Sequence, residues 1–274
     1  EIATNAELRD DRPADKRVQI VEREDATRTR TGSLAFDALY AMAVQEAHQN
    51  SVDTIRDAAY ADNRPIRVKA FQTGEKWHYV WTRDLAYALH LGLAAFDPSR
   101  ALESLRFKAS ALKPVVDGDH RFQMVQDTGS GGSYPVSSDR VVWAMGAHET
   151  LKYLRTEARK AVVKEFYSYF RDTIEQDRRL VFDPEDGLYR GEQSFLDWRE
   201  QTYPDWTADN VLPVAMSKAL SVNVANVFLL RTAAEYADAL GEAAAARRYA
   251  AWAKDLRAAV NRELFDSAAG LYRT

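Results

Sequence analysis

The sequence has 274 residues, of which 46% are hydrophobic and 28% are charged, with a net charge of −4. This balance is typical of a soluble globular protein with a core of its own. Basic residues are scattered among acidic ones, so we expect no nucleic-acid partner. The chain has no cysteine, which excludes disulfides and thiolate metal sites. No apolar run is long enough to predict a membrane span. The cellular compartment and the oligomeric state stay open.

Residues 1–32 are polar and charge-rich, and they predict an extended leading segment. Hydrophobic periodicity then predicts about seven helices and no alternation of strands and helices, which favours an all-α domain over residues 33–274. We expect residues 51–80 and 113–136 to be irregular. The predicted helices span residues 33–50, 83–96, 97–112, 137–155, 158–177, 217–240 and 243–263.

The two helices nearest the C-terminus differ in character. Residues 217–240 are apolar almost all round, which predicts burial on more than one side, whereas residues 243–263 are rich in alanine and charge. A buried helix paired with an exposed one suggests two concentric rings of helices.

A short repeat supports this arrangement. The pattern Phe-Asp, a turn ending in Gly and then Leu-Tyr-Arg occurs within residues 180–190 and again within 263–273. It predicts a helix end followed by a small β-turn element near residues 180–191, and repeated units of this kind predict repeated helical hairpins. Because the second copy reaches the last residue, we expect the chain to hold only part of the whole fold.

The segment 76–84 combines three aromatic residues, a histidine and an Arg-Asp pair at a predicted helix start. Asp84 is suited to cap that helix, since an acid is favourable at a helix N-terminus. The alternative is a sugar subsite. There Asp84 accepts hydrogen bonds from two hydroxyl groups, Arg83 orients it and Trp81 forms a stacking wall.

Three further segments carry polar or aromatic residues in patterns that suit a cleft. Asp139 lies in the first turn of a predicted helix after a glycine-rich loop, with Trp143 one turn later, although an acid at this position is also ordinary capping. Residues 191–206 gather four carboxylates and two tryptophans in a loop, which suits a ligand site or a solvated acidic loop. Asn223 and Asn226 share one face of an apolar helix, where an asparagine needs partners, and hydrogen bonding at the helix end is the alternative to ligand binding.

Trp81-Thr82-Arg83-Asp84 resembles the substrate-binding motif of glucoamylases, and it is similar to the Trp-x-Arg-Asp segment of glycogen-debranching amylo-1,6-glucosidases. These families share a fold of six helical hairpins, the (α/α)₆ toroid. The resemblance implies that Asp84 holds the sugar in the −1 subsite. It also implies that Asp139 and Trp143 line the cleft and that Asn223 points into it.

Phe195-Leu196-Asp197 resembles the general-acid loop of the debranching enzymes and of the processing α-glucosidases, which makes Asp197 the candidate acid. Glucoamylases carry a glutamate directly after a tryptophan. Here Arg199 follows Trp198, so Glu200 is the second choice. Trp198 and Arg199 are then expected beside the −1 and +1 sugars.

The resembling families invert the anomeric centre, with a base near the last hairpin. We therefore expect an exo-acting, inverting glycoside hydrolase for α-linked oligosaccharides, with an incomplete (α/α)₆ toroid in these residues and the base beyond residue 274. The five histidines show no metal-like spacing, so we predict neither a metal nor another cofactor. The alternatives are a related sugar phosphorylase or epimerase, or a helical-repeat interaction protein without catalysis.

Overall fold

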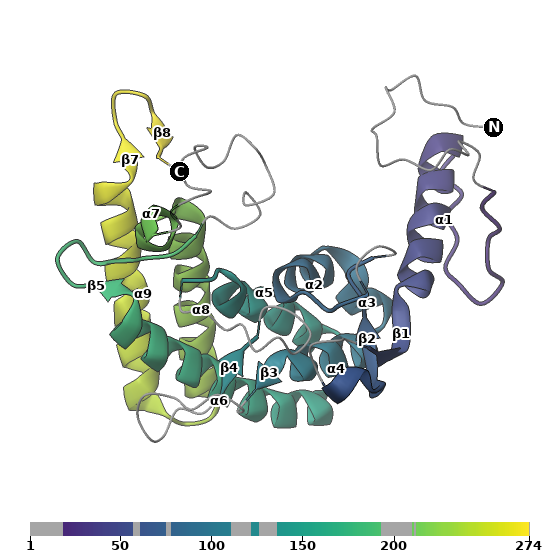
Figure 1. Ribbon diagram of the computed structural model, residues 1–274, viewed down its shortest axis with the longest axis horizontal. Helices are drawn as coiled ribbons and strands as arrows, with labels where there is room; N and C mark the ends of the chain where they lie inside the picture. Colours follow the sequence, from purple (N-terminus) through teal and green to yellow (C-terminus); the bar gives the residue numbers. More distant parts are fainter. Residues whose placement is uncertain are drawn as a thin grey trace. The chain divides into compact units, whose positions relative to one another are not determined.

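The computed structural model describes residues 19–56, 61–74, 78–110, 122–125, 136–192, 210 and 212–273. The described part is mostly helical, with small two-stranded hairpins (Figure 1). The chain divides into two compact units, residues 1–51 and 52–274. No described helix is both long and apolar enough to cross a membrane.

The first unit contains helix α1 (Leu34–Gln49), which confirms the helix predicted at 33–50. The helix begins where predicted because the Ser33 hydroxyl accepts a hydrogen bond from the amide of Phe36 at 3.4 Å. The described residues before α1 belong to the same unit. The predicted boundary between an entry segment 1–32 and a toroid 33–274 stays a prediction.

The sequence predicts an irregular segment over residues 51–80, but the described residues in this range form two strands. Strand β1 (Ser51–Ile55) pairs with strand β2 (Ile66–Phe71), with a 3₁₀ turn η1 (Ala61–Asn63) between them. In β2 the apolar residues face inward and Arg67 and Lys69 face outward, a period-2 pattern that is typical of a strand. The amide of Phe71 donates to the Ser104 hydroxyl at 3.0 Å, which attaches the hairpin to a helix.

The predicted helix 83–96 is present as three consecutive pieces: helix α2 (Thr82–Ala88), a π-helical segment η2 (Leu89–Leu93) and helix α3 (Ala94–Phe96). Helix α4 (Pro98–Lys108) follows, and the Asp97 carboxylate caps it by accepting from the amide of Arg100 at 2.9 Å. It is shorter than predicted because the chain turns into strand β3 (Ala109–Ser110), which pairs with β4 (Gln123–Met124).

Helices α5 (Asp139–Lys152) and α6 (Thr156–Leu180) confirm two further predicted helices. Eleven of the 14 residues of α5 are buried, so α5 is the central helix of the second unit. It packs closely on α2, since a Cβ added to Gly146 would lie 2.9 Å from the Cα of Ala86.

The last helices are α7 (Leu212–Met216), α8 (Leu220–Ala239) and α9 (Ala243–Glu263). Helices α8 and α9 run side by side (Figure 1). Half of the α8 residues are buried against five of 21 in α9, which confirms the predicted contrast between them.

Both copies of the repeat form β-hairpins, as predicted. Strand β5 (Phe182–Asp183) pairs with β6 (Leu188–Tyr189), and β7 (Phe265–Asp266) pairs with β8 (Leu271–Tyr272) in the same register. The turns end at Gly187 and Gly270 with φ of 80° and 67°, a conformation that favours glycine.

The helices of the second unit pack around α5 and α8. Helices α2, α5 and α8 contact one another in that order, while α4 and α6 pack on α5, and α6 and α9 pack on α8. The all-α prediction therefore holds at the level of a mostly helical structure with small hairpins. The (α/α)₆ toroid stays a prediction.

Candidate functional site

The N-terminal end of α2 is held by groups from outside the helix. Trp81 precedes α2 and contributes no side-chain cap, and the amide of Arg83 donates instead to Asp139 Oδ1 at 2.8 Å. The Thr82 hydroxyl donates to the carbonyl of Val125, and the amide of Trp81 donates to the Thr73 hydroxyl at 3.1 Å. A carboxylate from α5 thus caps α2, which fixes the Trp81–Asp84 motif at the start of α5.

Asp139 begins α5 and is only 2% exposed. Its second oxygen, Oδ2, accepts from the Ser137 hydroxyl at 2.9 Å. Burial raises the pKa of Asp139, while the charge of Arg83 and the hydrogen bonds from Ser137 and the Arg83 amide oppose the rise. Both oxygens of Asp139 therefore have partners within the described residues, and its contact with a sugar stays a prediction.

Glu192 joins the beginnings of α2 and α5. Its Oε1 atom lies 3.2 Å from Arg83 Nη1 and accepts from the amide of Ser138 at 3.0 Å. The hydroxyls of Ser137 and Ser138 both lie 3.3 Å from the same oxygen. The Arg83 side chain is 4% exposed, so this ion pair lies largely out of water. An acid is favourable here because helix N-termini carry partial positive charge.

The residues just before α8 contact Gly191, the neighbour of Glu192. The amide of Gly191 donates to the carbonyl of Ser217 at 2.8 Å, and the Ser217 hydroxyl donates back to the carbonyl of Gly191 at 2.8 Å. Gly191 also forms an isolated parallel bridge with Lys218. Residues 193–209, which include most of the acidic and aromatic segment 191–206, follow Glu192 in the sequence. After them, the chain is again beside Gly191 at Ser217.

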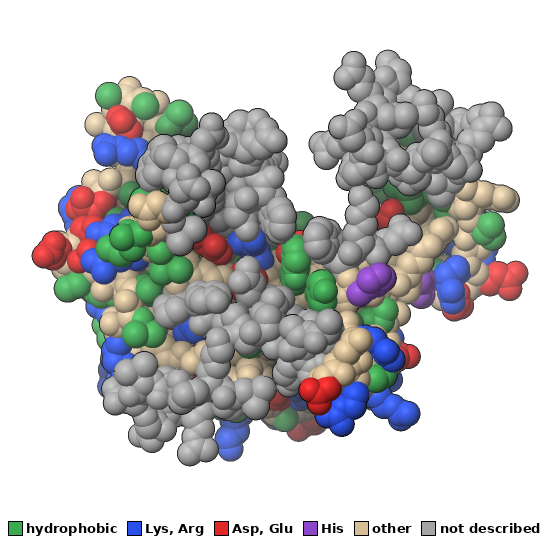
Figure 2. Space-filling model, viewed as in Figure 1, with side chains coloured by type: hydrophobic (Ala, Val, Ile, Leu, Met, Phe, Trp, Pro, Cys, Tyr) green, Lys and Arg blue, Asp and Glu red, His purple; other side chains and the backbone are tan. Residues whose placement is uncertain are grey.

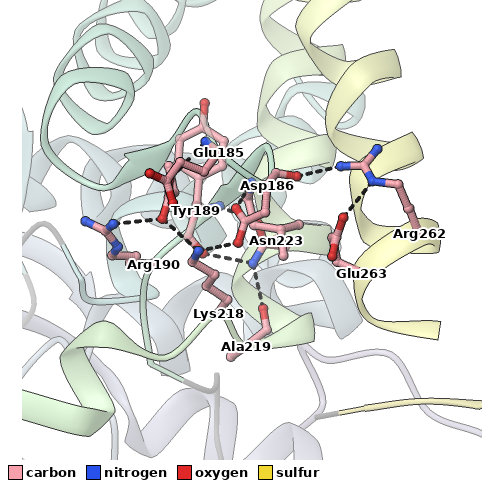
Figure 3. A network of polar contacts seen from close by, with 11 residues as sticks. Glu185, Asp186, Tyr189, Arg190, Lys218, Ala219, Asn223, Arg262 and Glu263 are labelled. Carbon is pink, nitrogen blue, oxygen red and sulfur yellow. Dashed lines mark hydrogen bonds and ion pairs between the residues drawn. The ribbon is translucent and has the colours of Figure 1, made fainter. Parts of the chain in front are cut away.

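A second polar network fixes this return point (Figure 3). Lys218 Nζ donates to Asp183 Oδ2 at 2.7 Å and to Asp186 Oδ2, and Arg190 Nη2 donates to Asp183 Oδ2 at 2.8 Å. The hydrogen bond from Lys218 is the main reason that the pKa of Asp183 falls to about 2. These contacts join the β5–β6 hairpin to the residues just before α8.

Asn223 completes the network by bridging α8 to strand β6. Its Oδ1 accepts from the amide of Tyr189 at 2.7 Å, and its Nδ2 donates to the carbonyls of Tyr189 at 3.0 Å and Ala219 at 2.9 Å. Asn223 is 0% exposed, and these contacts use both donors and the acceptor of its amide. Asn223 therefore makes the hydrogen bonds at a helix end that the sequence offered as the alternative to ligand binding. A direct contact of Asn223 with a sugar stays a prediction.

The other predicted binding residues fall into three groups. Trp81 and Asp84 are half-buried and so keep surface at the N-terminal end of α2. Arg83 and Asp139 are buried and support that end. Trp143 is 1% exposed and packs edge-on against Phe166 and two other core rings, with its Nε1 donating to the carbonyl of Leu105 at 3.1 Å. Its described contacts are those of a core residue, and its contact with a sugar stays a prediction.

The predicted catalytic residues Asp197 and Glu200, and the predicted binding residues Trp198 and Arg199, lie outside the described residues. Within the described ranges, no three His, Asp or Glu side chains lie together as metal ligands would.

Two residues of the site carried little signal in the sequence. Glu192 is one of the four carboxylates of the 191–206 segment, and nothing in that segment indicates that it joins two helix ends. Lys108 is fully buried at the end of α4 and donates to the carbonyl of Val80, directly before the motif. Burial of a charged residue depends on a partner distant in sequence, so local patterns could not reveal it.

We predict that Asn223→Ala lowers the free energy of unfolding by about 2 kcal/mol, since it leaves the buried backbone groups of Tyr189 without their partner. Asn226→Ala is the matched control. Asn226 is also buried on α8, but its amide donates only to the Val222 carbonyl of its own helix at 3.0 Å. Urea unfolding of both variants gives the comparison, and equal losses would contradict the bridging role of Asn223.

The lowered pKa of Asp183 predicts a pH dependence of stability. The ionised form contributes stability above the unfolded-state pKa of about 3.9, and this contribution is lost as the pH falls through the folded-state pKa of about 2. We expect Asp183→Asn to flatten the fall in urea midpoint between these pH values. The exposed Asp255→Asn should leave the wild-type fall intact, and identical curves for both variants would refute the prediction.

No protein-family model matches this chain, and a search of curated proteins finds no significant match. The chemistry proposed for the site therefore depends on the residues described above and on the motifs of the sequence.

Proposed function

We propose that this chain binds α-linked oligosaccharides at the N-terminal ends of α2, α5 and α8, as part of an exo-acting, inverting glycoside hydrolase with an (α/α)₆ toroid. In this proposal Asp84 accepts hydrogen bonds from the sugar in the −1 subsite, and Trp81 stacks against a pyranose face. Arg83, Asp139 and Glu192 hold these two residues in place.

One observation carries the proposal. Three parts of the chain far apart in sequence, the Trp81–Asp84 motif, the Ser137–Asp139 helix start and Glu192, meet at one end of the helices. The resemblance to the six-hairpin glycosidases implies that all three belong to a sugar cleft. A binding site needs a few accessible groups on a rigid support, and half-buried Trp81 and Asp84 above buried Arg83 and Asp139 satisfy that need.

The reaction requires an acid on one side of the glycosidic bond and a base on the other. We assign the acid to Asp197, with Glu200 as second choice, because the segment that carries them starts at Glu192. The acid protonates the leaving oxygen while the base activates a water, with the two carboxyl groups roughly 6.5–9.5 Å apart in an inverting enzyme. The base has no assigned residue here, and the resemblance places it in a later hairpin.

We predict that Asp84→Asn weakens the binding of α-linked oligosaccharides by about tenfold or more, since hydrogen bonds to a charged group contribute about 1.5–3 kcal/mol. Isothermal titration calorimetry with a panel of α-linked oligosaccharides measures the change. The exposed Asp238→Asn is the control and should bind as the wild type does. An unchanged dissociation constant for Asp84→Asn would remove Asp84 from the subsite.

We also predict that Asp197→Asn in the full-length protein abolishes hydrolysis of α-linked oligosaccharides and leaves their binding intact, because the amide cannot supply the proton. Product analysis by NMR gives both the rate and the anomer that forms first. Near-normal turnover would overturn this assignment, and loss of activity in Glu200→Gln alone would transfer the role to Glu200. Phosphate-dependent turnover would favour a phosphorylase, and sugar binding with no turnover in the wild type would favour a protein without catalysis.

A further inference from the structure

The two repeat hairpins have the same structure but different surroundings. In each, a Phe pairs with a Tyr across the strands, with ring centroids 5.1 Å apart in Phe182–Tyr189 and 5.0 Å apart in Phe265–Tyr272. In each, the turn glycine donates to the carbonyl of the strand aspartate, at 2.9 Å for Gly187 and 2.8 Å for Gly270. The first hairpin therefore serves as an internal reference for the second.

In each hairpin, the backbone N–H and C=O groups of the paired tyrosine face away from the partner strand. The amide of Arg190 donates to the carbonyl of Val181, and that of Arg273 to the carbonyl of Leu264, at 2.9 and 2.7 Å. This pattern makes the Phe-Tyr pair a non-hydrogen-bonded pair of an antiparallel ladder. The N–H and C=O groups of the paired tyrosine consequently point outward, where another element is needed to bind them.

In the first hairpin that element is helix α8. Asn223 binds both the amide and the carbonyl of Tyr189, and Lys218 binds Asp183 (Figure 3). Leu188 and Tyr189 are each 1% exposed, and both α8 and α9 contact β6. The first hairpin is thus covered by a helix that has an asparagine in its first turn and a lysine five residues before that asparagine.

In the second hairpin the same surface is open. Leu271 is 68% exposed and Tyr272 is 42% exposed. Among the described residues, no side chain donates to or accepts from the backbone of Tyr272. Figure 2 shows hydrophobic, acidic and basic side chains together at the upper left, where Figure 1 places this hairpin. An apolar surface beside outward-facing backbone groups is typical of a docking site.

We propose that the β7–β8 hairpin is a docking surface for an α-helix with the chemistry of α8. The helix presents an asparagine to the amide and carbonyl of Tyr272, an apolar side to Leu271, and a lysine to Asp266. This partner helix lies outside residues 212–273, because α8 itself already covers the first hairpin.

The charges of the second hairpin fit this partner. Asp266 uses Oδ1 to accept from the amides of Ala268 and Ala269, at 3.0 and 3.1 Å. Its Oδ2 faces Arg273 Nε at the longer distance of 3.9 Å, so this oxygen can accept a further ammonium group. Ala269 stands where the first hairpin has Asp186, so the partner's lysine meets one carboxylate here instead of two.

The test uses the intact chain and a synthetic peptide of residues 218–240 as the probe, since this peptide carries both Lys218 and Asn223. Fluorescence anisotropy measures binding, and hydrogen exchange measures protection of the Tyr272 amide. We expect saturable binding that slows exchange of this amide by about tenfold or more. A peptide with Asn223→Ala should lose this protection. The absence of saturable binding would overturn the proposal.

Two chain variants separate docking at the second hairpin from other modes of binding. Leu271→Asp changes an exposed residue and should abolish peptide binding, whereas Leu91→Asp, at a leucine that is 81% exposed elsewhere in the second unit, should leave binding intact. Binding that persists in Leu271→Asp would mean that the peptide exchanges with α8, and it would refute the proposal. Equal loss in both variants would refute it too, since it would indicate non-specific apolar adhesion.

Discussion

The carboxylate of Glu192 joins the N-terminal ends of α2 and α5, and the arrangement of the candidate site depends on it. One oxygen of Glu192 meets both the buried guanidinium of Arg83 and the backbone amide of Ser138. Removing Glu192 would take a carboxylate partner from the buried Arg83, which is destabilising although Glu192 itself is 20% exposed. Arg83 is held in place on one side by Glu192, while its amide is held on the other by Asp139. The carboxylates of Glu192 and Asp139 therefore fix the positions of Trp81 and Asp84, which flank Arg83 in the motif.

In this arrangement, some residues support the site from inside the protein and others keep solvent-exposed surface. Arg83 and Asp139 are buried and joined by a hydrogen bond from the Arg83 amide, so they are suited to fix geometry. Trp81 and Asp84 lie on the same turn and are only half-buried, so they are suited to meet a ligand. Three helix beginnings at one place also favour negative charge there, which is consistent with the acidic residues that gather around them.

The helices could be predicted from the sequence because hydrophobic periodicity and capping residues such as Ser33 and Asp97 act locally. The Phe-Asp to Leu-Tyr-Arg repeat was equally informative, since its turn glycines need a positive φ. The β1–β2 hairpin was missed even though residues 66–70 alternate between apolar and polar, because proline and glycine nearby suggested a loop. The roles of Glu192 and Asn223 could not be predicted. Arg83 and Glu192 are 109 residues apart in sequence, and the partners of Asn223 are backbone groups on a distant strand.

Sugar binding at the N-terminal ends of α2, α5 and α8 is tested most directly by a crystal structure of the protein with a bound α-linked oligosaccharide. We expect a pyranose ring against Trp81, with its hydroxyl groups hydrogen-bonded to the Asp84 carboxylate. A sugar bound instead at the opposite end of α5, near His90 and Glu149, would contradict it.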